Sequence, residues 1–352
     1  MTETTDAKTP MFLRGLWYFA AHSADVKPGG MTRRTMLEEP VLIAREPNGK
    51  LYALRDVCPH RGVPLSAGKM KGGEVECPYH GWRFGAEGKC THIPSLVDGQ
   101  PFEIDRIRVR KYPAHEEHGL VWVYMASNDE DAAAPPPPPV IPLTANARPR
   151  LIEAQSFPCE IDHAVVGLMD PAHGPYVHNS WWWRGKTKAY AKKKQFVPSD
   201  LGFTMVSHPP SSNSLLYRLL GGGLTTTIAF SLPSMRIEDI RAGRHQVLGV
   251  TTVTPVTATE SMVTQTMYWT MPWLTLLRPI LRPIAKVFLG QDRDIVALQT
   301  DWMRFKPTMM LIRDADVLAM WYYRLKKEWA EAKAAGRPFV NPVPATTLQW
   351  KS

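Results

Sequence analysis

Two short stretches decide the fold of this chain: Cys58-Pro59-His60-Arg61-Gly62 and Cys77-Pro78-Tyr79-His80-Gly81-Trp82. Each stretch carries one cysteine and one histidine, and residues 61–76 separate His60 from Cys77. Thiolates and imidazoles are common ligands of transition metals. Because each loop offers one donor of each kind, we expect Cys58, His60, Cys77 and His80 to converge on a single metal centre.

The spacing of these donors favours an iron–sulfur cluster over zinc. Zinc sites of mixed ligands usually pair like with like, as Cys-x2–4-Cys and His-x3–5-His, whereas these loops read Cys-x-His and Cys-x2-His. A Rieske-type [2Fe-2S] cluster has two thiolates on one iron and two imidazoles on the other. A structural zinc ribbon is the alternative, and the colour of the purified protein separates the two.

Glycines and prolines flank the four donors. Gly62 and Gly81 follow the histidines, where a tight turn needs a residue without Cβ. Pro59 and Pro78 follow the cysteines and stiffen the loops by fixing φ. At these positions the chain resembles the Rieske iron–sulfur proteins.

The bulk properties limit the remaining possibilities. The length of 352 residues predicts two domains. The first residues contain no basic segment followed by an apolar one, so we expect no secretory signal and a cytoplasmic location. The net charge of +9 could indicate nucleic acid, but the Lys and Arg residues are scattered, and we expect no nucleic-acid partner.

The distribution of β-rich runs and turn residues predicts an α+β protein. Residues 1–130, which include an apolar lead-in at 10–22, are expected to form a β-rich Rieske domain with an Asn48-Gly49 hairpin turn. A proline-rich linker should follow at 131–143. Residues 144–352 should form an α+β domain with an antiparallel sheet; the family resemblance given below implies that this sheet is helix-grip-like and that the domain is the catalytic one. Its expected strands are 204–207, 225–230, 247–255 and 261–269; a helix is expected around 160–180, and 288–332 should be largely helical.

The stretch 271–289 is apolar enough to raise the question of a membrane. Two arginines and two prolines at its centre make it a poor spanning helix, so we expect no membrane partner. Interior core, a lid over a substrate channel and contact with a membrane surface stay open, in that order.

A second group of metal-binding residues follows the linker, in Asp170-Pro171-Ala172-His173-Gly174-Pro175-Tyr176-Val177-His178. On a helix, Asp170 and His173 would share one face, and Gly174-Pro175 would bend the chain so that His178 returns to the same point. Two histidines and one carboxylate on one face of an iron leave the opposite positions open for oxygen and substrate. A single histidine is more often structural, but this pair lies downstream of the cluster motif.

With both motifs, the chain resembles the catalytic subunit of the Rieske non-haem iron oxygenases, in the group of vanillate and dicamba demethylases and, more distantly, pheophorbide oxygenases. The family motif Asn-x2-Asp-x2-His-x4-His implies iron ligands at His173 and His178. It also implies that Asp170 links His80 of a neighbouring subunit to His173. Gly167 stands where the family has Asn, so a polar contact from that position is absent.

The resemblance implies a third iron ligand on a later helix, in the segment 290–299. Asp292 is assigned to this role, with Gln291 where the family usually has Glu. Asp294 is the alternative by a shift of register. Either aspartate could instead stabilise the start of a helix through its dipole.

The resemblance implies a terminal oxygenase that hydroxylates or oxidatively demethylates a small hydrophobic or aromatic molecule with O2, as a monooxygenase rather than a dioxygenase. Electrons would come from NAD(P)H through a separate reductase or ferredoxin, reach the cluster and pass to the mononuclear Fe(II). A head-to-tail homotrimer is implied as well. The alternatives are a Rieske electron carrier without catalytic iron and a dioxygenase that dihydroxylates aromatic rings.

Overall fold

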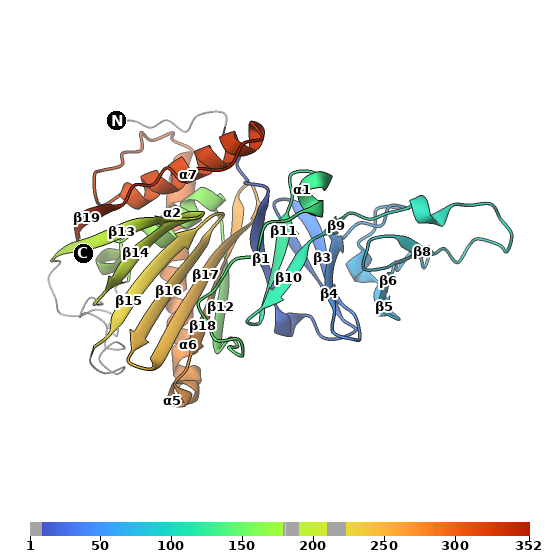
Figure 1. Cartoon of the computed structure of the whole chain (residues 1–352), viewed down its shortest axis with the longest axis horizontal. Coiled ribbons are helices and arrows are strands. Elements are labelled where there is room, and N and C mark those ends of the chain that lie inside the picture. The colour runs from blue at the N-terminus through green and yellow to red at the C-terminus, as the bar shows by residue number, and fades with distance from the viewer. Residues whose placement is uncertain (1–8, 179, 181–189, 210–222) are drawn as a thin grey trace. The chain divides into compact units, whose positions relative to one another are not determined.

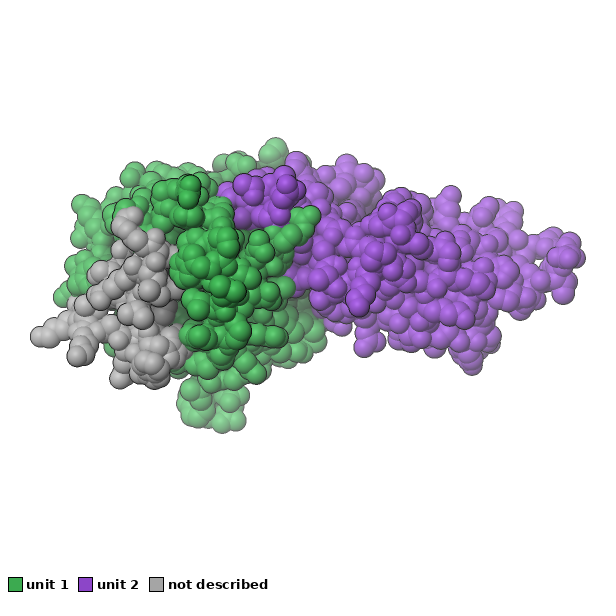
Figure 2. Space-filling view, turned by 90° about the horizontal axis from the view of Figure 1, so that it is seen from below, with its two compact units in different colours: residues 1–13, 148–352 green, residues 14–147 purple. Residues whose placement is uncertain are grey.

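The computed structural model describes residues 9–178, 180, 190–209 and 223–352, which form two compact units. The N-terminal unit spans Arg14–Ala147, and the C-terminal unit consists of Arg148–Ser352 together with the described residues up to Leu13 (Figure 2). Residues near the start join the C-terminal unit because buried Lys326 donates a hydrogen bond to the Met11 carbonyl (3.0 Å). The contacts therefore divide the chain after Ala147, later than the linker expected at 131–143.

The N-terminal unit consists of three antiparallel sheets with little helix (Figure 1). One has the order β1-β11-β10, another β2-β3-β4-β9, and the third β5-β6-β7-β8. The strands are β1 Leu16–His22, β2 Met31–Met36, β3 Glu39–Arg45, β4 Leu51–Arg55, β5 Lys69–Lys71, β6 Glu74–Glu76, β7 Arg83–Phe84, β8 Cys90–His92, β9 Lys111–Tyr112, β10 Ala114–Glu117 and β11 Leu120–Met125. The short helices are η1 Ser23–Asp25, η2 Leu65–Ala67, η3 Ile104–Arg106 and α1 Asp129–Ala133.

The sequence of this unit explains its hairpins. Gly49 lies between β3 and β4 with φ of 96°, a left-handed conformation that glycine adopts without strain, which confirms the turn expected there. The apolar lead-in contributes a strand to this unit: β1 is buried along its whole length and pairs with β11. The short strands of this unit surround an apolar core that includes Leu42, Leu54 and Phe84.

The C-terminal unit is built on one antiparallel eight-stranded sheet, in the order β12-β18-β17-β16-β15-β14-β13-β19 (Figure 1). Its strands are β12 Leu151–Phe157, β13 Ala191–Ser199, β14 Gly202–His208, β15 Thr225–Ser231, β16 Met235–Ala242, β17 His245–Thr257, β18 Glu260–Trp269 and β19 Thr346–Lys351. The helices are α2 Ile161–Met169, α3 Gly174–Val177, α5 Pro272–Leu276, α6 Arg278–Met303 and α7 Val317–Ala334. The four predicted strands are thus confirmed.

Helices cover one side of this sheet, which we call the inner face. Gln155 of β12 donates a hydrogen bond to the Lys286 carbonyl of α6 (2.8 Å). At the other end of the sheet, the ring of Phe230 in β15 packs edge-on against Tyr322 of α7. Figure 1 shows α6 crossing behind the strands. The inner face therefore lies beneath α6 and α7.

The helix expected over 160–180 is interrupted. Helix α2 ends at Met169, and Asp170 has an extended conformation (φ −60°, ψ 118°) before the short helix α3 begins at Gly174. The cause is Pro171, since a proline disfavours the helical conformation of the residue before it. Asp170 and His173 consequently do not share a helical face. The region 288–332, expected to be largely helical, contains the end of α6 and most of α7.

The apolar stretch 271–289 forms α5 and the start of α6. Met271, Leu274 and Leu289 are buried, whereas Leu276 is 81% exposed and Ile280 60% exposed. Met271 and Leu274 pack on the inner face of the sheet with Leu151 and Ile240. Within the described residues, no helix has both the length and the apolar character needed to cross a membrane.

Candidate functional site

The first candidate centre lies in the N-terminal unit, in the two loops between its small strands. Each loop closes on itself: the Cys58 N–H donates to the Val63 carbonyl (2.9 Å), and the Cys77 N–H donates to the Trp82 carbonyl (2.8 Å). Gly62 and Gly81 adopt left-handed φ values of 74° and 69°, as tight turns require. A Cβ on Gly81 would approach Pro94 Cγ to 3.0 Å, so no side chain fits there without a shift.

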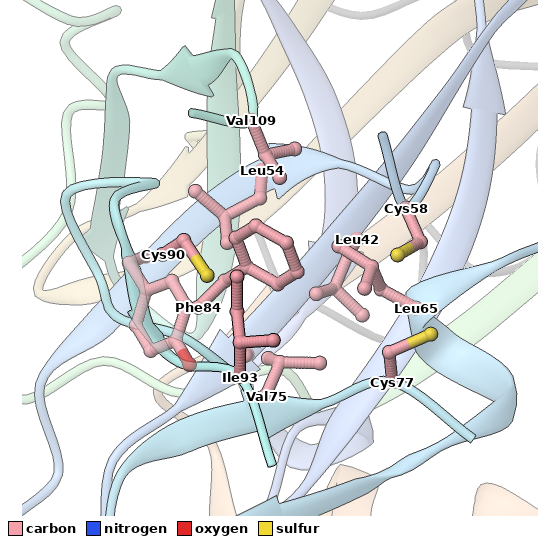
Figure 3. Close-up of a cluster of buried hydrophobic side chains, with 12 residues drawn as sticks. Leu42, Leu54, Cys58, Leu65, Val75, Cys77, Phe84, Cys90, Ile93 and Val109 are labelled. Atoms are coloured by element: carbon pink, nitrogen blue, oxygen red, sulfur yellow. The ribbon is translucent and has the colours of Figure 1, made fainter. Parts of the chain in front are cut away.

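The four predicted donors form two pairs. The thiols of Cys58 and Cys77 are buried and interact with each other, and Figure 3 shows them together at one edge of the apolar core, with Cys90 at the opposite edge. The rings of His60 and His80 lie 4.5 Å apart between centroids. A sulfur pair beside an imidazole pair is the donor set of a [2Fe-2S] cluster with unlike irons. The residues present therefore fit this cluster.

Backbone groups prepare the buried thiol of Cys58 for a metal. Burial raises its pKa to about 11, and the neighbouring Cys77 thiol adds to this rise. The N–H groups of His60 and Arg61 act in the opposite direction because they donate hydrogen bonds to the sulfur. Donors of this kind stabilise a thiolate, which is the form that binds metals.

Two aromatic residues within the second loop contact the histidines. The Trp82 ring stacks on His60 (4.5 Å between centroids, 4° between planes). Tyr79 lies against His80 (3.9 Å) and is 61% exposed. The sequence placed both aromatics in the motif without a role, and the structure shows that each lies against one imidazole ring.

The second candidate centre lies in the C-terminal unit, where His173, His178 and Asp292 meet. Their ligand atoms all lie within 4.8 Å of one another. The two Nε2 atoms are 3.2 Å apart, and Asp292 Oδ1 is 3.5 Å from His173 Nε2 and 3.4 Å from His178 Nε2. The histidines flank α3 and the aspartate comes from α6, so the fold brings together side chains more than a hundred residues apart. Two imidazoles and one carboxylate on one side of a point form a donor set that suits Fe(II).

A backbone carbonyl orients His173. Its Nδ1 lies 2.8 Å from the carbonyl oxygen of Asp170, so Nδ1 carries the proton and the Nε2 lone pair points toward Asp292. The Asp170 carboxylate is farther away, with Oδ2 at 3.8 Å from that nitrogen, and its Oδ1 accepts a hydrogen bond from the Ala172 N–H (2.7 Å). The residue holds His173 through its main chain, whereas its side chain stabilises the turn.

The side chain of Gln291 orients His178 in the way that the Asp170 carbonyl orients His173. Gln291 Oε1 lies 3.3 Å from His178 Nδ1, and its Nε2 donates to Ser180 Oγ (3.1 Å). The Phe288 ring stacks on the imidazole at 3.7 Å. Gln291 was noted in the sequence only as a departure from the family pattern, and its position beside Asp292 was the available signal for this role.

Burial controls the charge state of these three candidate ligands. It lowers the pKa of His178 to about 4, with a further decrease from His173, and it also lowers the pKa of His173. Both imidazoles are therefore neutral near pH 7 and offer a lone pair. Burial raises the pKa of Asp292 to about 7, although the positive charge of Arg236 acts against this rise.

Two other predicted positions lie outside this group of ligands. Asp294 is paired with Arg293 (2.7 Å), and its side chain is 67% exposed. Gly167 lies against α6, where a Cβ would meet Val296 Cγ2 at 3.5 Å. Of the two candidate aspartates, the geometry therefore favours Asp292.

Comparisons with known proteins identify the N-terminal domain and the overall fold. The family model described as the Rieske [2Fe-2S] domain matches residues 16–113. The oxygenase component of dicamba O-demethylase from Stenotrophomonas maltophilia is 34% identical over 174 residues, which cover 48% of each chain. The oxygenase subunit of 3-chlorobenzoate-3,4-dioxygenase from Comamonas testosteroni is 42% identical over 122 residues, or 34% of this chain and 28% of that protein.

The chain spans less than half the length of these curated relatives. A third relative, the chloroplastic chlorophyllide a oxygenase of Arabidopsis thaliana, is 31% identical over 176 residues, or 49% of this chain and 30% of that protein. Among solved structures, dicamba monooxygenase bound to dicamba superimposes with a TM-score of 0.76 at 22% identity, over 93% of this chain and 99% of that one. This last similarity establishes the fold.

Proposed function

Because this chain carries a Rieske [2Fe-2S] domain and is a homologue of Rieske non-haem iron oxygenases, we propose that it is a terminal oxygenase. It would use O2 and externally supplied electrons to hydroxylate or oxidatively demethylate a small hydrophobic or aromatic molecule. The relatives include proteins named as a demethylase and a dioxygenase, and we favour the monooxygenase reaction.

The observation that carries this proposal is the presence of two metal-binding donor sets in one chain. Cys58, His60, Cys77 and His80 would hold the cluster, and His173, His178 and Asp292 would hold a mononuclear Fe(II). In functional terms, we assign the cluster to a domain within 1–130, a linker to 131–143 and the catalytic iron to 144–352. An electron carrier needs only the first donor set, so the convergence of the second favours the oxygenase over a carrier.

When bound, a His-ligated [2Fe-2S] cluster passes single electrons, and a mononuclear iron with three protein ligands on one side leaves room for O2 and substrate. The protein's own residues prepare this chemistry. Hydrogen bonds from Nδ1 to the Asp170 carbonyl and to Gln291 hold both imidazoles in the tautomer that presents Nε2. Phe288 covers one face of His178 and keeps water from that side.

The partners follow from the same proposal. Electrons would come from NAD(P)H through a separate reductase or ferredoxin. We propose a head-to-tail homotrimer in which Asp170 links His80 of one subunit to His173 of the next, since two redox centres must be close for fast transfer. The cytoplasmic location expected from the sequence is part of this proposal.

The test is a reconstituted reaction combined with metal analysis. The purified protein should be brown and contain about three iron atoms per chain, two in the cluster and one in the second centre. With a ferredoxin reductase, NADH and a panel of methoxylated and unsubstituted aromatic compounds under 18O2, mass spectrometry should detect a product with one labelled oxygen or the loss of a methyl group.

Other results would identify the alternatives. Two irons per chain without turnover would indicate the electron carrier. Incorporation of two labelled oxygens into one ring would indicate the dihydroxylating dioxygenase. Colourless protein that contains zinc would overturn the assignment of the cluster.

A further inference from the structure

A buried hydrogen-bond donor in the second cluster loop has no acceptor within the protein. The indole Nε1 of Trp82 is buried, and among the described residues nothing accepts a hydrogen bond from it, the sulfurs of Cys58 and Cys77 included. An indole nitrogen can only donate. Because a buried N–H group without an acceptor destabilises a fold, the structure implies an acceptor that the polypeptide itself does not supply.

The position of this indole is fixed at the predicted cluster site. Its ring stacks on the imidazole of His60, at 4.5 Å between centroids and 4° from parallel. The side chain also packs against the apolar core that includes Cys58 and Cys77. The Trp82 carbonyl accepts a hydrogen bond from the Cys77 N–H (2.8 Å), so the residue closes the turn that presents Cys77 and His80. The indole therefore lies beside the residues that would hold the cluster.

A buried water is poorly suited to be the missing acceptor. An ordered water in a protein interior typically makes about three hydrogen bonds to polar groups. The face of His60 that Trp82 covers offers no donor or acceptor, and the core behind the indole consists largely of apolar side chains. These surroundings supply too few polar partners to hold a water molecule.

A [2Fe-2S] cluster brings acceptors of its own. Its two irons are bridged by inorganic sulfides, which carry negative charge and accept hydrogen bonds. The thiol pair and the imidazole pair of this unit fit such a cluster. Since neither cysteine sulfur accepts from Trp82, the bridging sulfides are the acceptors that remain.

A hydrogen bond to a sulfide favours the reduced form of a cluster. Reduction adds one electron, which makes the sulfurs more negative, and a hydrogen bond strengthens when its acceptor gains negative charge. Hydrogen bonds to the sulfurs are accordingly among the factors that set the reduction potential of iron–sulfur clusters. A donor in this position raises that potential.

We propose that the indole N–H of Trp82 donates a hydrogen bond to a bridging sulfide of the cluster and raises its reduction potential. Trp82 thereby makes the cluster easier to reduce by an external electron donor. The inference rests on the cluster ligands named in the proposed function, and it is independent of the reaction at the second centre.

The first test is the potential of Trp82→Phe. Phenylalanine keeps an aromatic ring against His60 and removes the N–H group. At a fixed applied potential, we expect the ratio of reduced to oxidised cluster to fall about tenfold, which for a one-electron couple corresponds to a decrease of about 59 mV. Spectroelectrochemical titration of the purified protein, followed by its visible absorption, measures this change without substrate or turnover.

Tyr79→Phe is the matched control. Tyr79 belongs to the same loop and lies against the other imidazole of the pair, that of His80 (3.9 Å), but it is 61% exposed. Loss of its hydroxyl group removes a donor that water can replace. This variant should keep the potential of the unmodified protein.

A second measurement detects the hydrogen bond itself. In protein labelled with 15N at the indole nitrogens, pulsed EPR of the reduced cluster should show a coupling between the unpaired electron and an indole 15N. The coupling should persist in Tyr79→Phe and be absent from Trp82→Phe. It separates the loss of the N–H group from a general change in packing, and its presence in the unmodified protein can be tested even if Trp82→Phe does not bind the cluster.

The outcomes also separate this inference from the proposed function. Brown protein that shows no indole coupling, or a Trp82→Phe potential that is unchanged or raised, would overturn the role of Trp82 and leave the oxygenase intact. Colourless protein that contains zinc would overturn the cluster assignment and this inference with it. A coupling that is lost together with a lowered potential in Trp82→Phe would support the inference even if no labelled oxygen enters any product.

Discussion

The two histidines of the second centre are held by different kinds of acceptor. His173 is oriented by a main-chain carbonyl, which substitution of Asp170 does not remove, whereas His178 depends on the side chain of Gln291. Contacts of this type fix the tautomer of a metal ligand and raise its affinity for the metal. The geometry of the centre is therefore more sensitive to position 291 than to position 170.

Asp292 and Asp294 form a natural pair of test and control. Asp292→Ala removes one of three ligands, so we expect loss of the mononuclear iron and of turnover, with the visible absorption of the cluster unchanged. Asp294→Ala removes an exposed side chain that pairs with Arg293 and should leave about three irons per chain. Iron analysis and absorption spectra decide between them, and the reverse result would mean that Asp294 is the ligand.

Metal binding should depend on pH through Asp292. Its pKa of about 7 in the metal-free protein means that it is protonated below pH 7 and must release that proton to bind a metal. The histidines do not compete, since their pKa values are lowered. We expect the affinity for Co(II) to rise about tenfold per pH unit up to about pH 7 and then to level off.

Anaerobic titrations with Co(II) from about pH 5.5 to 8 measure this dependence. Asp292→Asn, which cannot be deprotonated, should bind weakly and with little dependence on pH. If the unmodified protein bound Co(II) with the same affinity across this pH range, burial would not raise the pKa of Asp292 as described.

At the scale of elements, a buried ion pair joins α2 to α7. Lys326 Nζ lies 2.6 and 2.7 Å from the two carboxylate oxygens of Asp162, and Tyr322 donates to the same carboxylate (2.7 Å). Helix α2 leads directly into the segment with the two histidines. This pair therefore anchors the start of α2, the helix that precedes the segment with the candidate metal ligands.

Removal of the lysine from this ion pair should lower the stability of the protein. Lys326→Met leaves the Asp162 carboxylate in a mostly buried position without its cation, and we expect the free energy of unfolding to fall by about 3–5 kcal/mol. Arg337→Met is the control, because Arg337 pairs with Glu328 at the surface, where ion pairs contribute little. Urea unfolding of both variants measures the difference in their free energies of unfolding. Equal midpoints would show that the buried ion pair contributes no more to stability than the surface pair.

At the scale of the whole molecule, the two centres belong to separate units, and the proposed reaction requires an electron to pass between centres. The Asp170 carboxylate keeps one oxygen, Oδ2, without a hydrogen bond from any described residue, and its side chain is 33% exposed. A neighbouring subunit could reach this oxygen. The relay from His80 to His173 remains a prediction.

Asp170→Asn tests that relay. The amide keeps the size of the side chain and the hydrogen bond from Ala172, so both metals should stay bound and the trimer should persist. If the carboxylate links the centres, the rate of transfer from the reduced cluster to the mononuclear iron should collapse in single-turnover experiments. Near-normal product formation would mean that Asp170 has only a structural role. In that case its side chain contributes about 1 kcal/mol at most to the free energy of unfolding.

The sequence alone was sufficient wherever the chemistry is local. The four cluster donors could be predicted because a [2Fe-2S] site needs fixed residue types at short spacing. The glycines after the histidines could be predicted because a left-handed turn excludes most side chains. The long strands β17 and β18 could be predicted from runs of β-branched residues. The continuous helix over 160–180 was wrong, since the effect of Pro171 on Asp170 outweighed the apolar pattern.

Tertiary structure decided what depends on distant parts of the chain. Whether Asp292 or Asp294 faces the histidines depends on how α6 is rotated about its axis on the sheet. Spacing along the sequence does not determine that rotation. Gln291 and Arg236 acquire their positions only when α6 and β16 pack beside residues far away in sequence. The residue types and short spacings of the metal ligands were set by the sequence itself, whereas the orientation of those ligands, and the charge beside them, were set by long-range packing.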